Sequence, residues 1–440
     1  MNTAQASLNA ETFAVKSTAK AWLVCLSASL FFFYEFVQIM MFNSINPSLM
    51  RAFHVTATAT GQISAAYFIA NILFMFPAGM ILDRFSTKKI ILTAMVTCVI
   101  GTVLFSFSQS VAQASICRFI TGIGGSFPFL CCLRLASRWF PPRRLALVSG
   151  ITVTVAMLGG VTGQTPLTFL IDHLGWRHAL LVDALVGAVF TAIIFINVSD
   201  YPKGMKEAVL KQARSLNVWR MIGNTLKNKQ NWYFGLYTCF LNLPIMILGA
   251  IWAGLYLTQV FGLSQTQASL VTSMIFFGTI FGGPAVGLLS DMLGRRLLPM
   301  KVCGFISLVL MLVLIFDTQL SFTGLMVLYF LLGFVTSSQV ISYPAIAESN
   351  PHSLAGSALG FASVLIMLGP AIFQPLFGWL LDLHWSHHLI AGVPQYGLTD
   401  FRVALMILPF SFIVGTVLCY FARETHGRHL SSDHSNNQEY

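Results

Sequence analysis

Apolar segments of about twenty residues or more recur through the whole sequence, separated by polar links. Of the 440 residues, 56% are hydrophobic and 9% are charged, and the mean hydropathy is +0.76. A soluble protein carries about 25% charged residues, so this chain has too little charge to cover a surface in water. A bilayer-spanning helix needs about 20 mainly apolar residues, and the chain has room for twelve. The sequence therefore predicts an all-α membrane protein with twelve transmembrane helices.

The predicted spans divide into two sets of six around a long polar link. We expect a tail at 1–20, a six-helix bundle at 21–197, a basic linker at 198–230, a second bundle at 231–422 and a tail at 423–440. Apolar and basic residues are mixed in the linker, as in a short helix that lies on an anionic leaflet, and an ordinary solvated connector fits equally well. The expected spans are 21–46, 57–82, 89–108, 111–134, 144–171, 176–197, 231–260, 265–290, 298–317, 321–346, 354–382 and 401–422.

A short charged signature occurs twice, at 79–89 and 287–296, 208 residues apart. In each copy an Asp follows a Gly by four residues, and two adjacent basic residues come four or five positions later. Repetition at about half the chain length indicates two related bundles with pseudo-symmetry.

The basic residues are distributed unevenly between the two sides of the predicted bundle. If the N-terminus is cytoplasmic, that side receives 21 of the 25 Lys and Arg residues, and only Arg51, Arg118, Arg177 and Arg402 remain. Cytoplasmic loops carry an excess of Lys and Arg, so we expect both termini in the cytoplasm of a bacterium and the chain in its inner membrane. The net charge of +10 belongs to these loops, which argues against a nucleic-acid partner.

Two opposite charges lie at similar depth in the first predicted bundle. Glu35 follows Lys20 by fifteen residues, which is about 22 Å along a helix, and Arg118 precedes Arg134 by sixteen, about 24 Å. Charged residues at mid-membrane are costly and usually mark transport paths or proton relays. We interpret Glu35 and Arg118 as a proton-coupling pair. The alternative is a static ion pair that holds the first and fourth helices together.

Neutral polar and aromatic residues at membrane depth are candidates for solute binding. Tyr34 and Gln38 are one helical turn apart and share a face. The second bundle has no mid-span charge to match the first, so we expect it to supply hydrogen bonds and stacking. Each of these residues is also compatible with a helix–helix hydrogen bond. The candidates are Tyr34, Gln38, Tyr67, Gln164, Asn242, Trp252, Tyr256, Gln339 and Tyr343.

Charged residues near the cytoplasmic loops are candidates for gates. A second repeat, with an offset of 210, matches Pro141 and Gly150 to Pro351 and Gly360 and places Arg138 opposite Glu348. A charge pair there would latch one end of the molecule. Acidic residues can do the same against helix N-termini and basic loops. The candidates are Asp83, Arg84, Arg138, Asp291, Arg295 and Glu348.

No motif for metal binding, cofactor binding or catalysis is present. The eight cysteines all lie in apolar segments, and the histidines at 384–388 and 426–434 show no second shell of ligand-orienting residues. HExxH, GxxxxGK[ST] and GxSxG are absent. We therefore expect no cofactor, no metal site and no enzymatic activity.

The loop signatures, together with Arg118-Phe119-Ile120-Thr121-Gly122-Ile123-Gly124, resemble those of the major facilitator superfamily over essentially the full chain. Tyr34-Glu35-Phe36, Asn46-Pro47 and Gly175-Trp176-Arg177 are similar to bacterial phagosomal-type nutrient transporters, relatives of lysosomal dipeptide carriers. The helix 5 signature of the family's antiporters is only half present. The resemblance implies that helices 1, 4, 7 and 10 line a central cavity and that the two halves rock about it.

The sequence and this resemblance together predict a secondary transporter that works by alternating access. We expect a symporter that imports a small polar solute with protons, such as an amino acid, a short peptide or a nucleoside. Its partners are then the solute, protons and the lipid bilayer, and we expect a monomer. An exporter of a metabolite or metal chelator, and a membrane sensor that does not transport, are the alternatives.

Overall fold

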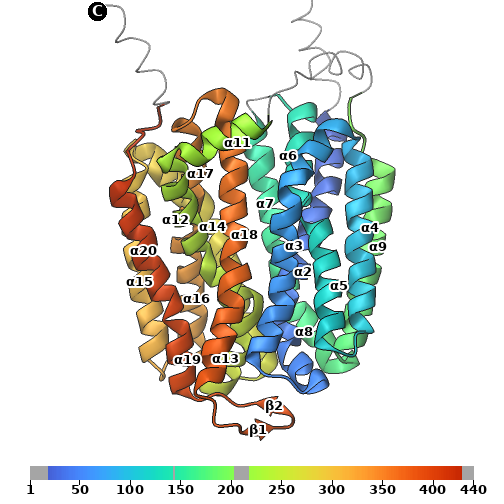
Figure 1. Ribbon diagram of the computed structural model, residues 1–440, viewed down its shortest axis with the longest axis vertical. Coiled ribbons are helices and arrows are strands. Elements are labelled where there is room, and N and C mark those ends of the chain that lie inside the picture. The colour runs from blue at the N-terminus through green and yellow to red at the C-terminus, as the bar shows by residue number, and fades with distance from the viewer. Residues whose placement is uncertain (1–17, 142–143, 203–217, 429–440) are drawn as a thin grey trace, which may run out of the picture.

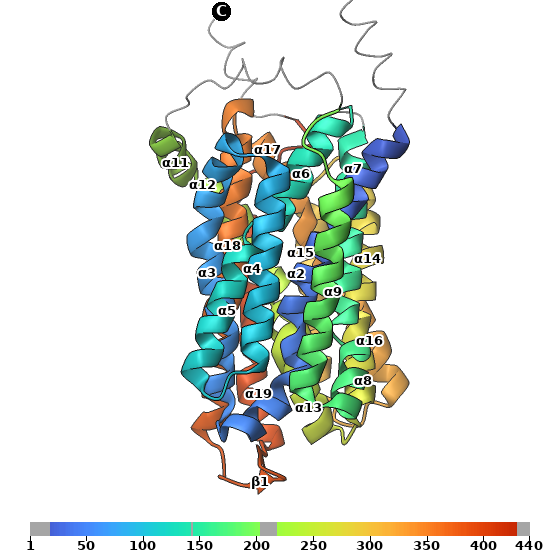
Figure 2. The ribbon, with the colours of Figure 1, turned by 90° about the vertical axis from the view of Figure 1, so that its right-hand side faces the viewer.

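The computed structural model describes residues 18–141, 144–202 and 218–428. Two helical bundles stand side by side, one formed by α2 to α9 and the other by α12 to α20 (Figure 1). The first and last described residues lie at one end of the molecule, here named the tail end. The short hairpin β1–β2 projects from the opposite end, named the hairpin end (Figure 2). The residues 1–17, most of the predicted linker and 429–440 lie outside the described part.

The first bundle contains six membrane-length segments, because two pairs of helices each continue across a break. α5 and α6 form one segment and are separated at Ser126–Phe127, where Pro128 starts the second helix. α7 and α8 form another and are separated at Gly163 and Gln164. The bounds are α2 Thr18–Phe53, α3 Ala57–Arg84, α4 Thr87–Ser106, α5 Val111–Gly125, α6 Pro128–Trp139, α7 Leu145–Thr162, α8 Thr165–Leu174 and α9 Trp176–Asn197.

The second bundle repeats this arrangement with two different interruptions. The eight residues that directly follow Pro244 form the π-helix η2. The five residues between α16 and α17 form the 3-10 helix η3. Such stretches mark strained or functional positions. The bounds are α11 Val218–Lys227, α12 Lys229–Pro244, η2 Ile245–Trp252, α13 Ala253–Val260, α14 Gln265–Leu293, α15 Leu297–Phe316, α16 Phe322–Thr336, η3 Ser337–Ile341, α17 Ser342–Glu348, α18 His352–Leu383, β1 Leu389–Ile390, β2 Val393–Pro394, α19 Leu398–Leu405 and α20 Ile407–Phe421.

The fold class predicted from the sequence is confirmed. Within the described residues, eleven helical segments are long and apolar enough to cross a membrane, and α3 adds a further predicted span of 28 residues. Predicted and observed ends agree within a few residues, except that α2 continues past Pro47 to Phe53. Lipid explains this accuracy, because each span must satisfy its backbone internally and keep an apolar surface.

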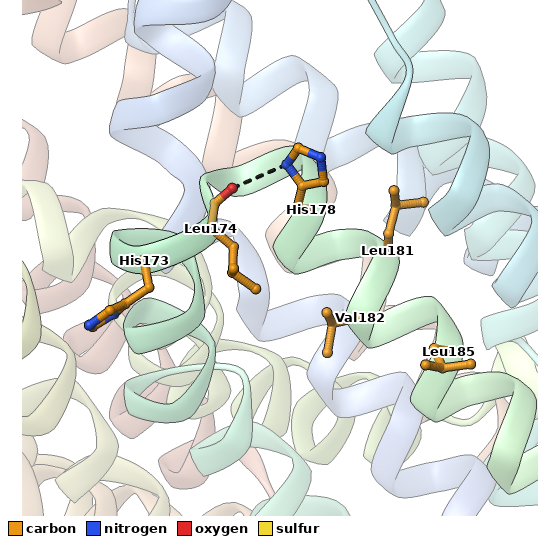
Figure 3. A pocket seen from close by; sticks show the side chains of 6 residues that line it. All are labelled: His173, Leu174, His178, Leu181, Val182 and Leu185. Carbon is orange, nitrogen blue, oxygen red and sulfur yellow. Dashed lines mark hydrogen bonds between the residues drawn. The ribbon is translucent and has the colours of Figure 1, made fainter.

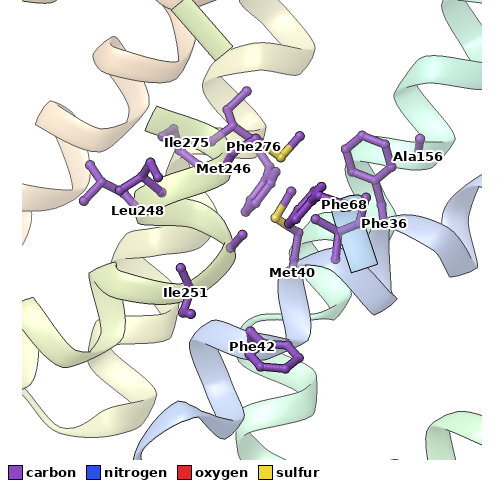
Figure 4. Close-up of a cluster of buried hydrophobic side chains, with 14 of the residues drawn as sticks. Phe36, Met40, Phe42, Phe68, Ala156, Met246, Leu248, Ile251, Ile275 and Phe276 are labelled. Carbon is purple, nitrogen blue, oxygen red and sulfur yellow. The ribbon is translucent and has the colours of Figure 1, made fainter. Parts of the chain in front are cut away.

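The two bundles pack together through apolar side chains at mid-depth. Phe36 and Met40 on α2 lie near Met246 of η2 and Phe276 of α14 (Figure 4). α3 also lies along α18, and α7 along α14. This contact is tight: a Cβ on Gly160 would lie 2.7 Å from the Phe276 ring. The halves therefore meet along a close-packed seam, and any rearrangement must separate or slide these surfaces.

Candidate functional site

Glu35 lies at the middle of α2, seventeen residues after Thr18 and eighteen before Phe53. Its side chain is turned inward and its exposed fraction is 4%. The Tyr67 hydroxyl donates a hydrogen bond to Glu35 Oε1 at 3.3 Å. The Tyr67 ring also lies 4.7 Å from the Arg118 guanidinium, measured to the ring centroid. Tyr67 therefore connects the two residues that the sequence predicts as a pair, and in the described part of the chain no ion pair joins them directly.

Arg118 is fully buried, and the guanidinium stacks on aromatic rings instead of meeting a carboxylate. It lies over Phe42 at 4.8 Å as well as over Tyr67. Nε, Nη1 and Nη2 all lack a hydrogen-bond partner among the described residues. The same holds for both amide atoms of Asn71, which lies one helical turn from Tyr67 on the same face of α3. Buried donors without partners are costly, so this place is chemically prepared for an anionic or polar guest.

Glycines on α5 allow this arrangement because they let the helix backbone approach Tyr67 closely. A Cβ on Gly125 would lie 1.9 Å from the Tyr67 hydroxyl oxygen, and a Cβ on Gly122 would lie 2.3 Å from its carbonyl oxygen. Any side chain at either position would displace Tyr67. Small residues let helix backbones approach each other closely, and here they make room for Tyr67.

A second buried carboxyl, Asp183 on α9, was missed by the sequence analysis. Gln38 Nε2 donates a hydrogen bond to Asp183 Oδ2 at 2.5 Å. Gln38 Oε1 accepts a hydrogen bond from the Thr102 hydroxyl at 2.9 Å, and the Tyr34 hydroxyl donates to Thr102 Oγ1 at 3.5 Å. Tyr34 and Gln38 thus share a face, as predicted, but that face is directed into the first bundle. A lone Asp inside the apolar stretch 176–197 was the available signal.

Gln164 lies at the contact between the two bundles. The break between α7 and α8 places its side chain so that Nε2 donates to Gly249 O of η2 at 2.6 Å. Its Oε1 accepts from Asn43 Nδ2 at 2.7 Å, while Asn43 Oδ1 accepts from the Gly254 backbone N–H at 2.6 Å. Gln164 and Asn43 therefore hold α2 and the start of α8, in the first bundle, against η2 and α13, in the second. These contacts lie on the hairpin side of Glu35.

The candidates of the second bundle do not gather at one place. Gln339 Nε2 donates to Asn242 Oδ1 at 3.2 Å, which joins the η3 interruption to α12. Trp252 stacks on Phe377 with ring centroids 5.3 Å apart, and its Nε1 has no partner in the described residues. Two further candidates lie apart from these. Tyr256 donates to Leu314 O at 2.7 Å inside its own bundle, and Tyr343 is half-buried.

The hairpin end is closed by a carboxylate that the sequence analysis did not single out. Asp382 lies at the end of α18, in the second bundle, and receives hydrogen bonds from the start of α3, in the first. The Thr56 hydroxyl donates at 2.6 Å, the Thr58 backbone N–H at 2.8 Å and the Thr58 hydroxyl at 2.5 Å. Tyr396 in the β-hairpin region donates at 2.7 Å. Asp382 therefore caps an α-helix of the opposite bundle, where a negative charge is favoured.

The predicted gate residues lie at the tail end, but each bundle pairs its own charges. Arg138 lies 3.9 Å from Asp200 and donates to the Thr87 hydroxyl at 3.0 Å. Glu348 pairs with Arg296 at 2.8 Å. No ion pair joins Arg138 to Glu348 in the part described, so the latch expected between them is not formed in this conformation.

The two copies of the repeated loop signature differ in what the structure shows. In the second copy Asp291 pairs with Arg296 at 2.5 Å, whereas the gate candidate Arg295 is exposed. In the first copy Arg84 is exposed, and the side chain of Asp83 lies outside the described residues.

The structure reveals a symmetry that the aligned motifs did not contain. Asp200, just after α9, accepts from the Lys88 N–H at 2.8 Å and from the Ser86 hydroxyl at the start of α4. Glu424, just after α20, accepts from the N–H groups of Arg296 and Leu297 at 2.7 and 2.9 Å at the start of α15. Burial raises the pKa of Glu424, but these backbone donors and that of His426 outweigh it and hold the pKa below its usual value. Each bundle thus closes its last segment onto its third.

Two open hollows on the outside of the molecule contain none of the candidate residues. The one in Figure 3, about 610 Å³, lies along α8 and α9 and is lined by His173, Leu174, His178, Leu181, Val182 and Leu185. His173 and His178 bond backbone carbonyls of their own turns, so they do not converge on a ligand. The other lies on α15, around Val313 and Phe316. In the described residues no three potential metal ligands come together.

Within the described residues, two helical bundles of six segments, with buried charges in one and polar contacts between them on the hairpin side, define a multi-pass membrane carrier. The sequence profile of the Major Facilitator Superfamily matches residues 28–248 and 234–436, and the chain belongs to that family. A solved D-xylose-proton symporter has the same fold, with a TM-score of 0.73 at 15% identity over 93% of this chain and 99% of that one.

Curated relatives of the chain carry different functional names. A probable sulfoacetate transporter of Cupriavidus necator is 22% identical over 82% of this chain and 87% of its own length. A probable galactarate/D-glucarate transporter of Escherichia coli is 25% identical over 75% and 81%. A protein of Escherichia coli named as a membrane sensor is 22% identical over 84% and 87%.

Proposed function

We propose that this protein imports a small organic anion together with protons, by alternating access at a site between its two bundles. The observation that carries the proposal is Arg118, a fully buried guanidinium whose three nitrogens have no hydrogen-bond partner among the described residues. Leaving such a group unpaired costs several kcal/mol in a dry interior, at about the level measured for broken buried ion pairs. A carboxylate or sulfonate bound there would offset that cost.

The geometry of a guanidinium favours a planar or forked anion. Arg118 offers parallel N–H donors that match a carboxylate in a bidentate manner, while Phe42 and Tyr67 hold the plane of the group from its faces. Amino acids and short peptides carry such a carboxylate, whereas nucleosides do not. Two relatives bear the names of organic acids, sulfoacetate and galactarate or D-glucarate, which supports a solute of this class.

Glu35 is the group that would carry the proton. It is buried at the middle of α2, and among the described residues its hydrogen-bond donor is Tyr67, at the long distance of 3.3 Å. An isolated carboxylate in such a place is far less stable than the neutral acid. Since Tyr67 touches both Glu35 and Arg118, an anion that binds Arg118 and moves this ring would change the environment of the Glu35 proton. Proton loading and solute binding would thereby be coupled.

The two ends of the molecule supply the alternation. The hairpin end is held closed by Asp382 and by the Asn43–Gly254 contact between bundles. We infer that the tail end is cytoplasmic, because the order of the spans in the sequence assigns 21 of the 25 basic residues to the loops and tails of that side. The hairpin end would then be the outer gate, which must open for a solute to enter from outside.

Uptake into proteoliposomes under an imposed pH gradient tests the proposal. The solutes are sulfoacetate, D-glucarate, amino acids and dipeptides, with uridine as the uncharged control. We expect an organic anion to accumulate, accumulation to stop when the gradient is collapsed, and Glu35→Gln to abolish gradient-driven accumulation. Asp317→Asn, which changes an exposed acid bonded to the nearby Gln319 N–H, is the matched control. Accumulation that persists without the gradient would exclude proton coupling, and uptake of uridine alone would exclude the anion.

A sensor is the second candidate, because one relative with similar coverage is named as a membrane sensor. A sensor would bind its ligand without moving it. Thermal stabilisation of the purified protein by an anion, with no uptake or efflux of that anion in vesicles, would favour the sensor. Efflux from preloaded vesicles, with no inward accumulation, would favour the exporter.

A further inference from the structure

The first bundle encloses three charged side chains at mid-depth, two acids and one base. Glu35, Asp183 and Arg118 have exposed fractions of 4%, 7% and 0%. Arg118 lies seven residues into α5 and Asp183 seven residues into α9, and both helices start at the hairpin end. The two are therefore at similar depth. One positive charge cannot balance two carboxylates in a low-dielectric interior, so one of the acids must be protonated at rest.

The hydrogen bonds around the two acids are unequal. Asp183 accepts a short bond of 2.5 Å from the Gln38 amide, which is held in turn by Thr102. Glu35 accepts one bond of 3.3 Å from Tyr67. Donors at close range stabilise a carboxylate, so the environment of Asp183 favours its charged form more than that of Glu35 does. Coulombic attraction also links Arg118 to Asp183.

We propose that Asp183 is the charged partner that balances Arg118, held in its ionised form by Gln38, so that Glu35 is left as the neutral, proton-carrying acid. Asp183 is then a positioning residue: it keeps the resting site electrically neutral and leaves the guanidinium donors free for a solute. The assignment rests on the proposed proton coupling through Glu35. It adds a residue on α9, which is not among the segments expected to line the cavity.

The other groups around Asp183 do not provide a competing charge. Tyr34 and Gln38 face it from α2, Cys98 and Thr102 from α4, and Arg118 from α5. On the neighbouring α8 the titratable residues are Asp172 and His173, which are exposed at the hairpin end. Gln38 and Tyr34 both support the ionised form of Asp183, and Gln38, with its short bond, is the stronger donor. It is three residues from Glu35 on α2, so one helix connects the two acids.

Infrared difference spectra of the purified protein, recorded without solute, test this assignment. Protein that contains 13C-carboxyl-labelled glutamate or aspartate is compared with unlabelled protein at neutral pH. The label shifts the C=O stretch of the acid that holds the proton. We expect the buried COOH band to shift with labelled glutamate and to be insensitive to labelled aspartate. A band that shifts with aspartate, or no such band, would overturn the proposal.

Gln38→Leu provides the second measurement, because it removes the stronger donor to Asp183 and leaves Glu35 in place. We expect the proton to move, so that the band now shifts with labelled aspartate instead of labelled glutamate. Asp172→Asn is the control and should leave the spectrum unchanged, and each variant is first shown to elute as wild type in size exclusion. A Gln38→Leu spectrum identical to wild type contradicts the role given to Gln38. These spectra need no transport, so their result is separate from whether an organic anion is imported.

Discussion

Replacing Asp382 by Ala should open the hairpin end. In the structure its carboxylate holds three short hydrogen bonds from the first bundle, two of them to Thr58 at 2.5 and 2.8 Å and one to Thr56 at 2.6 Å. Hydrogen bonds to charged groups contribute about 1.5–3 kcal/mol each, and we take about 1 kcal/mol here because Asp382 is partly exposed. The sum of about 3 kcal/mol corresponds to a roughly 150-fold increase in the ratio of open to closed molecules.

Hydrogen–deuterium exchange of the Gly254 amide measures this opening. That N–H donates to Asn43 Oδ1 across the seam at 2.6 Å, and Asp382 is not one of its partners, so its exchange reports separation of the bundles. We expect exchange in Asp382→Ala to be faster by about two orders of magnitude when opening is followed by rapid closing. Asp382→Asn keeps the shape but not the charge and should have a smaller effect.

Asp317→Asn is the matched control, because Asp317 is an exposed acid at the same end that accepts a hydrogen bond from the nearby Gln319 N–H. It should leave Gly254 exchange unchanged. If Asp382→Ala also leaves that exchange unchanged, Asp382 does not hold the hairpin end closed and the reasoning above is refuted.

Three other predictions concern the site and the tail end. Arg118→Lys keeps the charge but loses the planar fork stacked on two rings, so we expect the kcat/KM of anion uptake to fall about tenfold or more with little change in thermal unfolding; unchanged uptake would argue against a bidentate role. Gly125→Ala places a Cβ against the Tyr67 hydroxyl and should abolish uptake, whereas Gly150→Ala, with open space around its Cβ position, should not; equal activity of the two would remove Tyr67 from the mechanism. The lowered pKa of Glu424 means that its stabilising effect is complete above its unfolded-state pKa of about 4.3 and is lost as the pH falls through the folded value. The difference in unfolding temperature between wild type and Glu424→Gln should therefore shrink on acidification, and a difference that grows would contradict the cap.

The burial of Glu35 and Arg118 was predictable from position alone, because a charge in the middle of an apolar span has few places to lie except inside the protein. Their relationship was not. The sequence suggested a direct pair, and the structure places Tyr67 between them, since the rotation of α3 decides which ring enters that space. Asp183 was as visible in the sequence as Glu35, but its partner Gln38 could be recognised only once α2 and α9 were seen to pack together.

For the gate residues, too, the sequence located the charges and the structure decided their partners. The repeated loop signature located the charged tail end, but only the structure shows that Arg296, in the turn between α14 and α15, pairs with Asp291 while Arg295 is exposed. Asp382 closes the hairpin end against Thr58, 324 residues earlier in the chain, and no sequence period connects them.

The sequence by itself determined the solvent, the number of spans, the internal repeat and the depth of the charged residues. Lipid imposes these features locally, because each span must satisfy its own backbone and carry an apolar surface whatever lies beside it. Only the tertiary structure decided which polar groups meet. Those contacts depend on the rotation of each helix and on how the two bundles are docked, and a shift of a single residue would exchange every partner.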